Sequence, residues 1–137
     1  MIDTNVFLHP HTTDAHSQEC RRFLSLVEAG RIQVWLDALV VHELSYALRH
    51  YWKDASRGQI ATYLRHLVHL PGVLVADLDL LLATLDRWGR TDGLGFVDAY
   101  LVELAAQRGG LPIYSKNVRE LRAQGATVPD PLPTAQP

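Results

Sequence analysis

The feature that most constrains the fold is an alternation of short apolar runs with longer stretches of helical periodicity. Residues 32–36, 73–76 and 111–114 are short runs rich in branched, aromatic and other apolar side chains, and the segments between them repeat apolar residues at three- and four-residue spacing. In residues 14–29 this spacing is carried by Cys20, Phe23, Leu24 and Val27. Strands joined by helical crossovers pair in parallel. We therefore predict an α/β fold with a parallel sheet and helices on both faces.

Residues that start and stop helices mark the element boundaries. Gly30 stands where the first long helix would end, and Asp37 is a good N-cap for the next, which carries an apolar face through Tyr51. Ser56 or Arg57 opens another helix. Further helices are predicted from Asp77 or Asp79 through Trp88, over 96–108 and over 118–123, with short extended segments at 1–5 and 126–128.

Length and composition indicate one domain. A chain of 137 residues can bury a core of its own, and its net charge of −2 argues against binding nucleic acid by bulk electrostatics. The single cysteine excludes a disulfide framework or a cysteine-rich zinc site. Four prolines in residues 129–137 predict an extended tail after a domain of residues 1–128. With no signal sequence at Met1 and no apolar run long enough to span a bilayer, we expect a cytoplasmic protein that does not enter membranes.

Polar residues fall where a parallel sheet gathers its working groups, at the carboxyl ends of strands and beside helix starts. Asp3 follows the first apolar residues, Asp98 stands near the start of the helix over 96–108, and Glu43 lies mid-helix among apolar neighbours. Ser115 and Asn117 follow the strand over 111–114. Taken singly, each has a structural explanation as a helix cap or a solvated residue. Together they predict a polar site.

Three neighbouring carboxylates favour a hard divalent cation, because they could not all stay ionised close together without one. Mg²⁺ and Mn²⁺ prefer oxygen ligands and can activate water for attack on a phosphate. We expect Asp3, Glu43 and Asp98 to be ligands or water-positioning groups. Asn5, Ser115 and Asn117 would give neutral hydrogen-bonding support.

Four segments resemble PIN-domain ribonucleases, especially the VapC-like toxins of bacterial toxin–antitoxin pairs. Residues 2–8 (Ile-Asp-Thr-Asn-Val-Phe-Leu) are similar to the opening of that family, and Val41-His42-Glu43-Leu44 matches its helical glutamate. Residues 95–101 are similar to its aspartate-alanine helix start, and residues 113–118 to its strand end, where Thr-x-Asp is usual. The resemblance covers the chain up to about Val128.

The resemblance implies a three-layer α/β/α fold with a central parallel sheet of about five strands and a Mg²⁺- or Mn²⁺-dependent endoribonuclease acting on RNA. It also implies a homodimer and an antitoxin protein that blocks the acidic pocket. Asp3, Glu43 and Asp98 fall on the three core acids of the family, Asn117 on the fourth catalytic position, and Ser115 on its hydroxyl residue.

Two departures from the family pattern qualify this interpretation. Asn117 is an amide where an aspartate is usual, so we expect one metal ion rather than two. Only two residues precede Asp3, where a buried strand needs about five. Either the true start lies upstream or the central strand is unusually short. These departures motivate an alternative, a catalytically weak PIN-like module that binds RNA or a partner.

Other signals are weaker. The histidines do not complete a zinc motif, since His42-Glu43 is followed by Tyr46 where HExxH requires histidine. A phosphorylated receiver domain would use Asp77 and Lys116 but leaves Glu43 and Asp98 without a role. Two basic groups are candidates for RNA-phosphate contacts or for plain solvated faces: Lys116, Arg119 and Arg122, and Arg49, Lys53 and Arg57.

Overall fold

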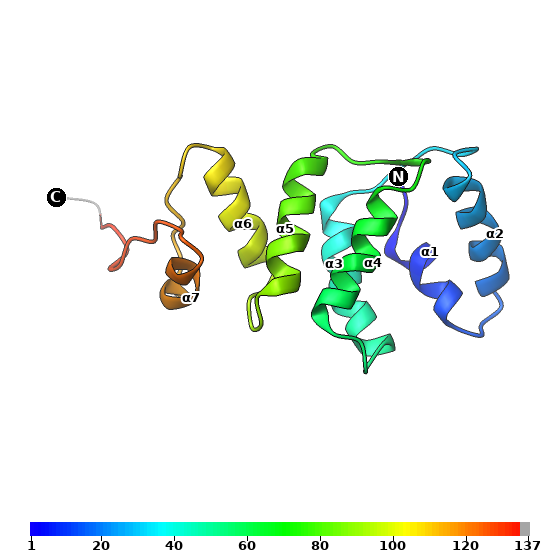
Figure 1. The fold of residues 1–137 in the computed structure, drawn as a ribbon, viewed down its shortest axis with the longest axis horizontal. Helices are drawn as coiled ribbons and strands as arrows, with labels where there is room; N and C mark the ends of the chain where they lie inside the picture. Colours follow the sequence, from blue (N-terminus) through cyan, green and yellow to red (C-terminus); the bar gives the residue numbers. More distant parts are fainter. Residues whose placement is uncertain (135–137) are drawn as a thin grey trace.

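The computed structural model describes residues 1–134, in which helices alternate with short extended segments (Figure 1). The last three residues of the predicted tail, 135–137, lie outside the described residues. The helices are α1 (Thr4–Leu8), the 3₁₀ turn η1 (His9–His11), α2 (Ser17–Glu28), α3 (Ala38–Tyr51), α4 (Arg57–Val68), α5 (Leu78–Arg90), α6 (Phe96–Gln107) and α7 (Val118–Ala123). The strands are β1 (Val34–Trp35) and β2 (Val73–Leu74).

The helix starts follow the predicted caps. The carboxylate of Asp37 accepts from the backbone N–H of Leu39 at the start of α3, and Asp77 accepts from Leu80 at the start of α5. Ser56 and Gln59 form a capping box at the start of α4. One local prediction is wrong: residues 4 and 5 are not part of a strand, because α1 begins directly after Asp3.

A small parallel sheet joins the first half of the chain. β1 pairs with β2 in parallel, with Val34 opposite Val73 and Trp35 opposite Leu74. On the other side of β1, the backbone N–H of Ile2 donates to the carbonyl of Trp35 at 2.9 Å. The first residues therefore lie beside β1 in extended form, and the order across the sheet is β2, β1, Ile2.

The prediction of about five strands is wrong for the described residues, which contain two. Residues 111–114 and 126–128 are extended, and the N–H of Ile113 donates to the carbonyl of Thr127 at 2.8 Å, but no ladder forms. Within residues 1–134, no backbone hydrogen bond joins this pair of segments to the Ile2 side of the sheet. The helices consequently do not enclose a full central sheet in three layers.

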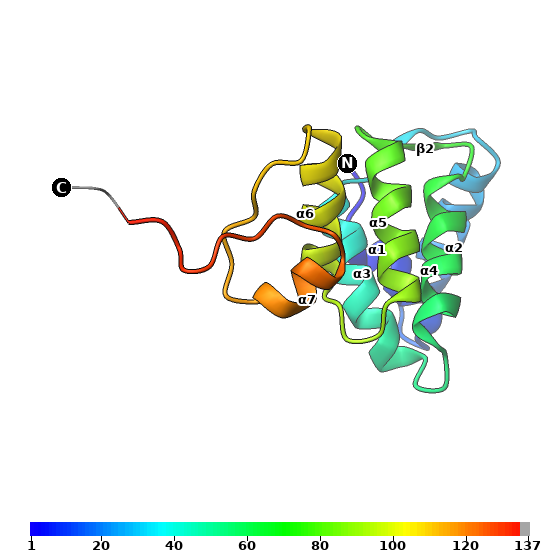
Figure 2. The ribbon, with the colours of Figure 1, turned by 60° about the vertical axis from the view of Figure 1, so that its left-hand side comes forward.

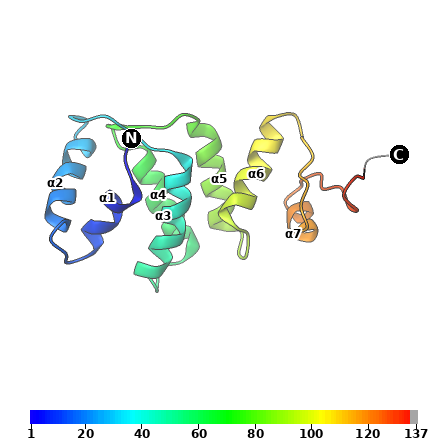
Figure 3. The same ribbon diagram turned by 180° about the vertical axis from the view of Figure 1, so that it is seen from behind.

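The apolar residues form two clusters instead of one. The larger lies among α1 to α6 and includes Leu44, Leu64 and Leu85, each at most 1% exposed. The smaller contains Val102, Ile113, Leu121 and Val128 and lies between α6 and the segments around α7. Figures 1 and 3 show the helices side by side along the molecule, with α2 near one end and α7 toward the other.

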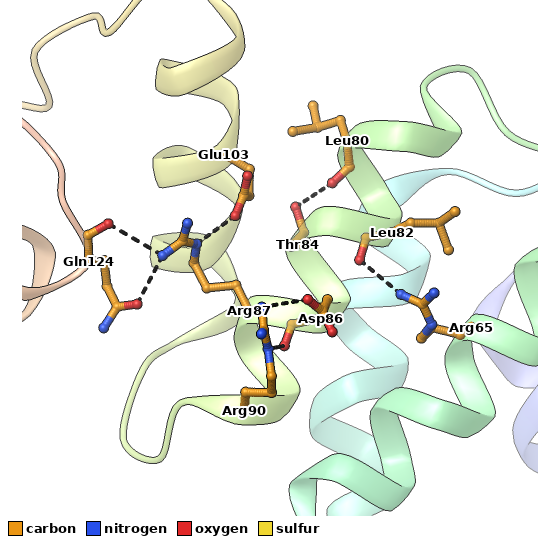
Figure 4. A network of polar contacts seen from close by, with 9 residues as sticks. All are labelled: Arg65, Leu80, Leu82, Thr84, Asp86, Arg87, Arg90, Glu103 and Gln124. Carbon is orange, nitrogen blue, oxygen red and sulfur yellow. Dashed lines mark hydrogen bonds and ion pairs between the residues drawn. The ribbon is translucent and has the colours of Figure 1, made fainter.

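Polar contacts fasten the smaller cluster to the larger one. Arg87 of α5 donates through Nε to Oε1 of Glu103 on α6 at 2.6 Å, and through Nη1 to the backbone and side-chain oxygens of Gln124 after α7 (Figure 4). Figure 2 shows α7 beneath the extended segments that follow α6. Arg87 thus joins α5 to α6 and to the end of α7. No helix within residues 1–134 is both long and apolar enough to cross a membrane.

Candidate active site

The first part of the candidate site joins α1 to α3. The hydroxyl of Thr4 donates to Oε2 of Glu43 at 2.7 Å. Thr4 is only 2% exposed, because α1 packs against α3, whereas the Glu43 side chain stands at the exposed edge of its helix. The carboxylate of Glu43 is therefore held in place by a neutral donor while remaining accessible to solvent.

Asp3 lies directly before α1, beside this pair. It is exposed, and its Oδ2 accepts a long hydrogen bond of 3.4 Å from the side-chain amide of Asn5. Asn5 thus has the supporting position expected of it. Thr4 was not among the predicted site residues, although it stands between two of them. The burial of Thr4 against α3 depends on tertiary packing. In the sequence, the only signal for Thr4 is that it is a hydroxyl residue next to Asp3.

The second part of the site joins α6 to the turn before α7. The side-chain amide of Asn117 donates to Oδ2 of Asp98 at 2.8 Å across 19 residues of sequence. Oγ of Ser115 accepts from the backbone N–H of Asn117 at 3.0 Å, which fixes the turn. Both Asp98 and Asn117 are half-buried. The structure thus places Asp98, Asn117 and Ser115 together.

The side chains at these helix starts do not cap their helices. Asp3 and Asn117 occupy the N-cap positions of α1 and α7, yet neither makes a side-chain capping hydrogen bond. Elsewhere in the molecule Asp37, Ser56 and Asp77 do cap. Capping stabilises a helix by about 1 kcal/mol. Asp3 and Asn117 do not make this stabilising contribution and instead contact other polar side chains. Helix capping therefore does not explain why these polar residues stand at the helix starts.

The chemistry of the donor set fits a hard divalent cation. Within the described residues, Asp3, Glu43 and Asp98 form no salt bridge with lysine or arginine, and their hydrogen-bond partners are neutral. Their negative charge is therefore not compensated by the protein. The arrangement is incomplete: over residues 1–134, no three histidine, cysteine, aspartate or glutamate side chains stand close enough together to hold one metal ion.

The basic residues beside Asn117 are engaged in contacts of their own. Lys116 lies 4.0 Å from Asp130, and Arg119 pairs with Glu120 at 2.9 Å. Arg122 donates to the carbonyl of Val128 through Nε and Nη2, at 3.2 and 2.7 Å, and so holds the segment around Val128 against α7. All three residues are exposed, but Arg122 differs from the other two in that its partner is a backbone carbonyl instead of a carboxylate.

The histidines near the N-terminus form a hydrogen-bonded turn. Nδ1 of His9 lies 2.6 Å from Oδ2 of Asp14, and the ring of His16 packs against that of His9 with 5.3 Å between centroids. Hydrogen bonds from Thr12 and His9 lower the pKa of Asp14 to about 2. The ring of His11 packs instead against Trp52. These contacts organise the turn between α1 and α2.

Two hollows flank the His42–Phe96 contact, whose rings lie 5.4 Å apart. The larger, about 450 Å³, is mostly apolar and lies among the starts of α3, α5 and α6. The smaller, about 180 Å³, contains two arginines. Both hollows lie between α3 and the start of α6, the two helices that carry Glu43 and Asp98, although neither carboxylate lines them.

Comparison with known proteins identifies the family. The family model of the PIN domain matches residues 1–117, which include every acidic residue of the candidate site and Asn117. No curated protein and no solved structure matches the chain. PIN-domain proteins are commonly nucleases that use divalent metal ions, which supports a nuclease as the general class. The chain belongs to the PIN-domain family.

Proposed function

We propose that this protein is a Mg²⁺- or Mn²⁺-dependent endoribonuclease whose site consists of Asp3, Glu43, Asp98 and Asn117. The observation that carries the proposal is the behaviour of the polar residues at helix starts. Asp3 and Asn117 do not cap their helices, and the three carboxylates have only neutral partners in the described part of the chain. A half-buried carboxylate without a cationic partner, as Asp98 is, favours a divalent cation, to which the exposed Asp3 and Glu43 would add oxygen ligands.

Each residue would have a distinct role. Asp3 and Asp98 would supply oxygen ligands, and Glu43, oriented by the Thr4 hydroxyl, would position the attacking water and accept its proton. Asn117 would hold the Asp98 carboxylate in a fixed orientation. When bound, a divalent cation would acidify water and stabilise charge on the phosphate. Attack on the phosphodiester would leave a 5′-phosphate and a 3′-hydroxyl.

The finer biological role follows from the resemblance of residues 2–8 and 95–101 to VapC-like toxins. We infer that the protein is the toxin of a toxin–antitoxin pair, forms a homodimer, and is inhibited by a cognate antitoxin. Asn5 and Ser115 support the site through their hydrogen bonds to Asp3 and to the backbone of Asn117.

Cleavage of a labelled single-stranded RNA by the full chain tests the proposed activity. We expect Mn²⁺ to support cleavage and EDTA to abolish it. Asp3→Asn and Asp98→Asn should each slow cleavage at least about 100-fold, a typical loss when a positioned catalytic group is removed. Asp79→Asn is the matched control, because Asp79 is an exposed first-turn acid of α5. Wild-type rates in Asp3→Asn and Asp98→Asn would refute the mechanism.

A second candidate function is a PIN-domain module that binds RNA or a partner without cutting it. Two observations favour it: Asn117 is an amide at the fourth acidic position, and residues 1–134 contain no group of three side chains arranged around one metal ion. RNA binding in EDTA without cleavage after Mn²⁺ is restored would support this function. Cleavage on Mn²⁺ addition would exclude it.

A further inference from the structure

We propose that the smaller hollow, between α3 and the start of α6, binds a backbone phosphate of single-stranded RNA, with Arg49 as its principal contact. The inference rests on the proposed function, because it concerns the substrate of that same site. The hollow has a volume of about 180 Å³. Its walls come from α3, from the start of α4 and from the α5–α6 connection: His42, Ser45, Tyr46, Arg49, Arg57, Trp88, Gly95 and Phe96.

The hollow contains positive charge that the protein does not neutralise. Arg57 donates through Nη1 to the carbonyl oxygens of Trp88, Thr91 and Leu94, all neutral acceptors. Its guanidinium also lies over the Trp88 ring, 4.8 Å from the centroid. Within residues 1–134, neither Arg49 nor Arg57 forms an ion pair. A half-buried cation without a counter-ion is costly, and an anion in the hollow would relieve that cost.

The two arginines also repel each other. Burial lowers the pKa of Arg57, and the nearby charge of Arg49 lowers it further. Asp92 acts in the opposite direction but with a smaller effect. The electrostatic balance of the hollow therefore favours an added anion. Arg49 is the better candidate to contact it, because its side chain is exposed and makes no hydrogen bond in the described structure, whereas Arg57 is held by three carbonyls.

The size and position of the hollow indicate the phosphodiester of a polymer. At about 30 Å³ per water molecule, the hollow holds about six waters, enough for a hydrated phosphate group. The His42–Phe96 contact forms one wall, and the same two helices carry Glu43, one residue after His42, and Asp98, two residues after Phe96. A strand with one phosphate at these carboxylates would bring a neighbouring phosphate to Arg49. Tyr46, which is 78% exposed at the rim, offers a second donor.

Substitution of Arg49 separates this role from a structural one. Fluorescence anisotropy with a labelled single-stranded RNA is measured in EDTA, over a series of salt concentrations. Arg49→Gln should weaken binding about fivefold to tenfold and reduce the slope of log affinity against log salt by about 0.7, the value for one lost phosphate contact on a single strand. Arg22→Gln, an equal charge change on the exposed face of α2, is the control and should leave binding within twofold. Equal affinities in the two variants would overturn the proposal.

A kinetic experiment with Mn²⁺ distinguishes failure of this inference from failure of the proposed function. Arg49→Gln should raise KM about fivefold with kcat within twofold of wild type, because it removes binding rather than chemistry. If the wild type binds RNA but does not cut it, and Arg49→Gln still weakens binding, the nuclease proposal fails and the phosphate site stands. If the wild type cuts RNA and Arg49→Gln leaves KM unchanged, the phosphate site fails and the nuclease stands.

Discussion

The contact between Arg87 and Glu103 should be the strongest single tie between α5 and α6. Nε of Arg87 lies 2.6 Å from Oε1 of Glu103, and the side chains are only 27% and 18% exposed. Unit charges about 4 Å apart interact by about 4 kcal/mol at an effective dielectric constant of 20. Remaining solvent contact and the desolvation of the two charges reduce this interaction energy. We therefore expect a coupling free energy of about 1.5 kcal/mol, which is larger than the roughly 1 kcal/mol that exposed ion pairs reach.

A double-mutant cycle measures this coupling. Arg87→Met keeps the apolar stem, Glu103→Gln keeps the shape, and the double variant completes the cycle. Unfolding free energies come from urea titrations followed by tryptophan fluorescence, to which the buried Trp88 of α5 contributes. Arg87→Met should cost more than Glu103→Gln, because it also releases Gln124. A coupling below about 0.5 kcal/mol would place this contact among ordinary surface pairs and would refute our account of how α6 is held to α5.

Three further predictions concern the site, the N-terminal turn and the packing. Asn117→Asp should bind Mn²⁺ about tenfold more tightly by calorimetry, because it adds a carboxylate beside Asp98. In EDTA the same variant should be about 1 kcal/mol less stable to unfolding, because the two carboxylates repel each other. Weaker Mn²⁺ binding than in the wild type would contradict this prediction. Burial lowers the pKa of His11 below its usual 6.5, so its neutral form stabilises the fold above pH 6.5 and that contribution is lost as pH falls through the folded-state pKa. The urea midpoint should therefore fall more between pH 7 and pH 5 in wild type than in His11→Phe, and equal falls would count against the role of burial. Gly72→Ala should lower the free energy of unfolding in urea by about 3 kcal/mol, because a Cβ would lie 2.2 Å from the carbonyl oxygen of Ile32. Gly93→Ala is the control: it has open space around it and a φ of +80°, so it should lower the free energy of unfolding by only about 1 kcal/mol. Equal losses in the two variants would exclude the steric explanation.

The helices were predictable from the sequence because their determinants are local. Asp37 and Asp77 accept hydrogen bonds from residues two and three positions later, and Gly30, with φ of +69°, follows the end of α2. The extent of the sheet was not predictable, because strand pairing depends on segments far apart in sequence. Ile2 and Ile113 both occupy extended segments, yet each bonds a different partner segment.

The same distinction between local determinants and contacts between distant segments applies to the candidate site. Asp98 and Asn117 were predicted to be neighbours because Asp98 stands near a helix start and Asn117 follows a strand, where a parallel sheet gathers polar groups, and a hydrogen bond joins them in the structure. The bond from Thr4 to Glu43 was missed, because it depends on how closely α1 packs against α3. Arg122 stays a predicted phosphate contact, and its bonds to Val128 were not predictable because they depend on the path of the chain after α7.

Calorimetric titration of Mn²⁺ into the wild type and Asp98→Asn tests the central claim most directly. We expect saturable binding at one site in the wild type, loss of that binding in Asp98→Asn, and retention in the Asp79→Asn control. The physical reason is that Asp98 is a carboxylate with a neutral amide partner and no compensating cation in residues 1–134. Equal Mn²⁺ affinity in the wild type and Asp98→Asn, or no saturable binding in either, would contradict the proposed acidic metal site.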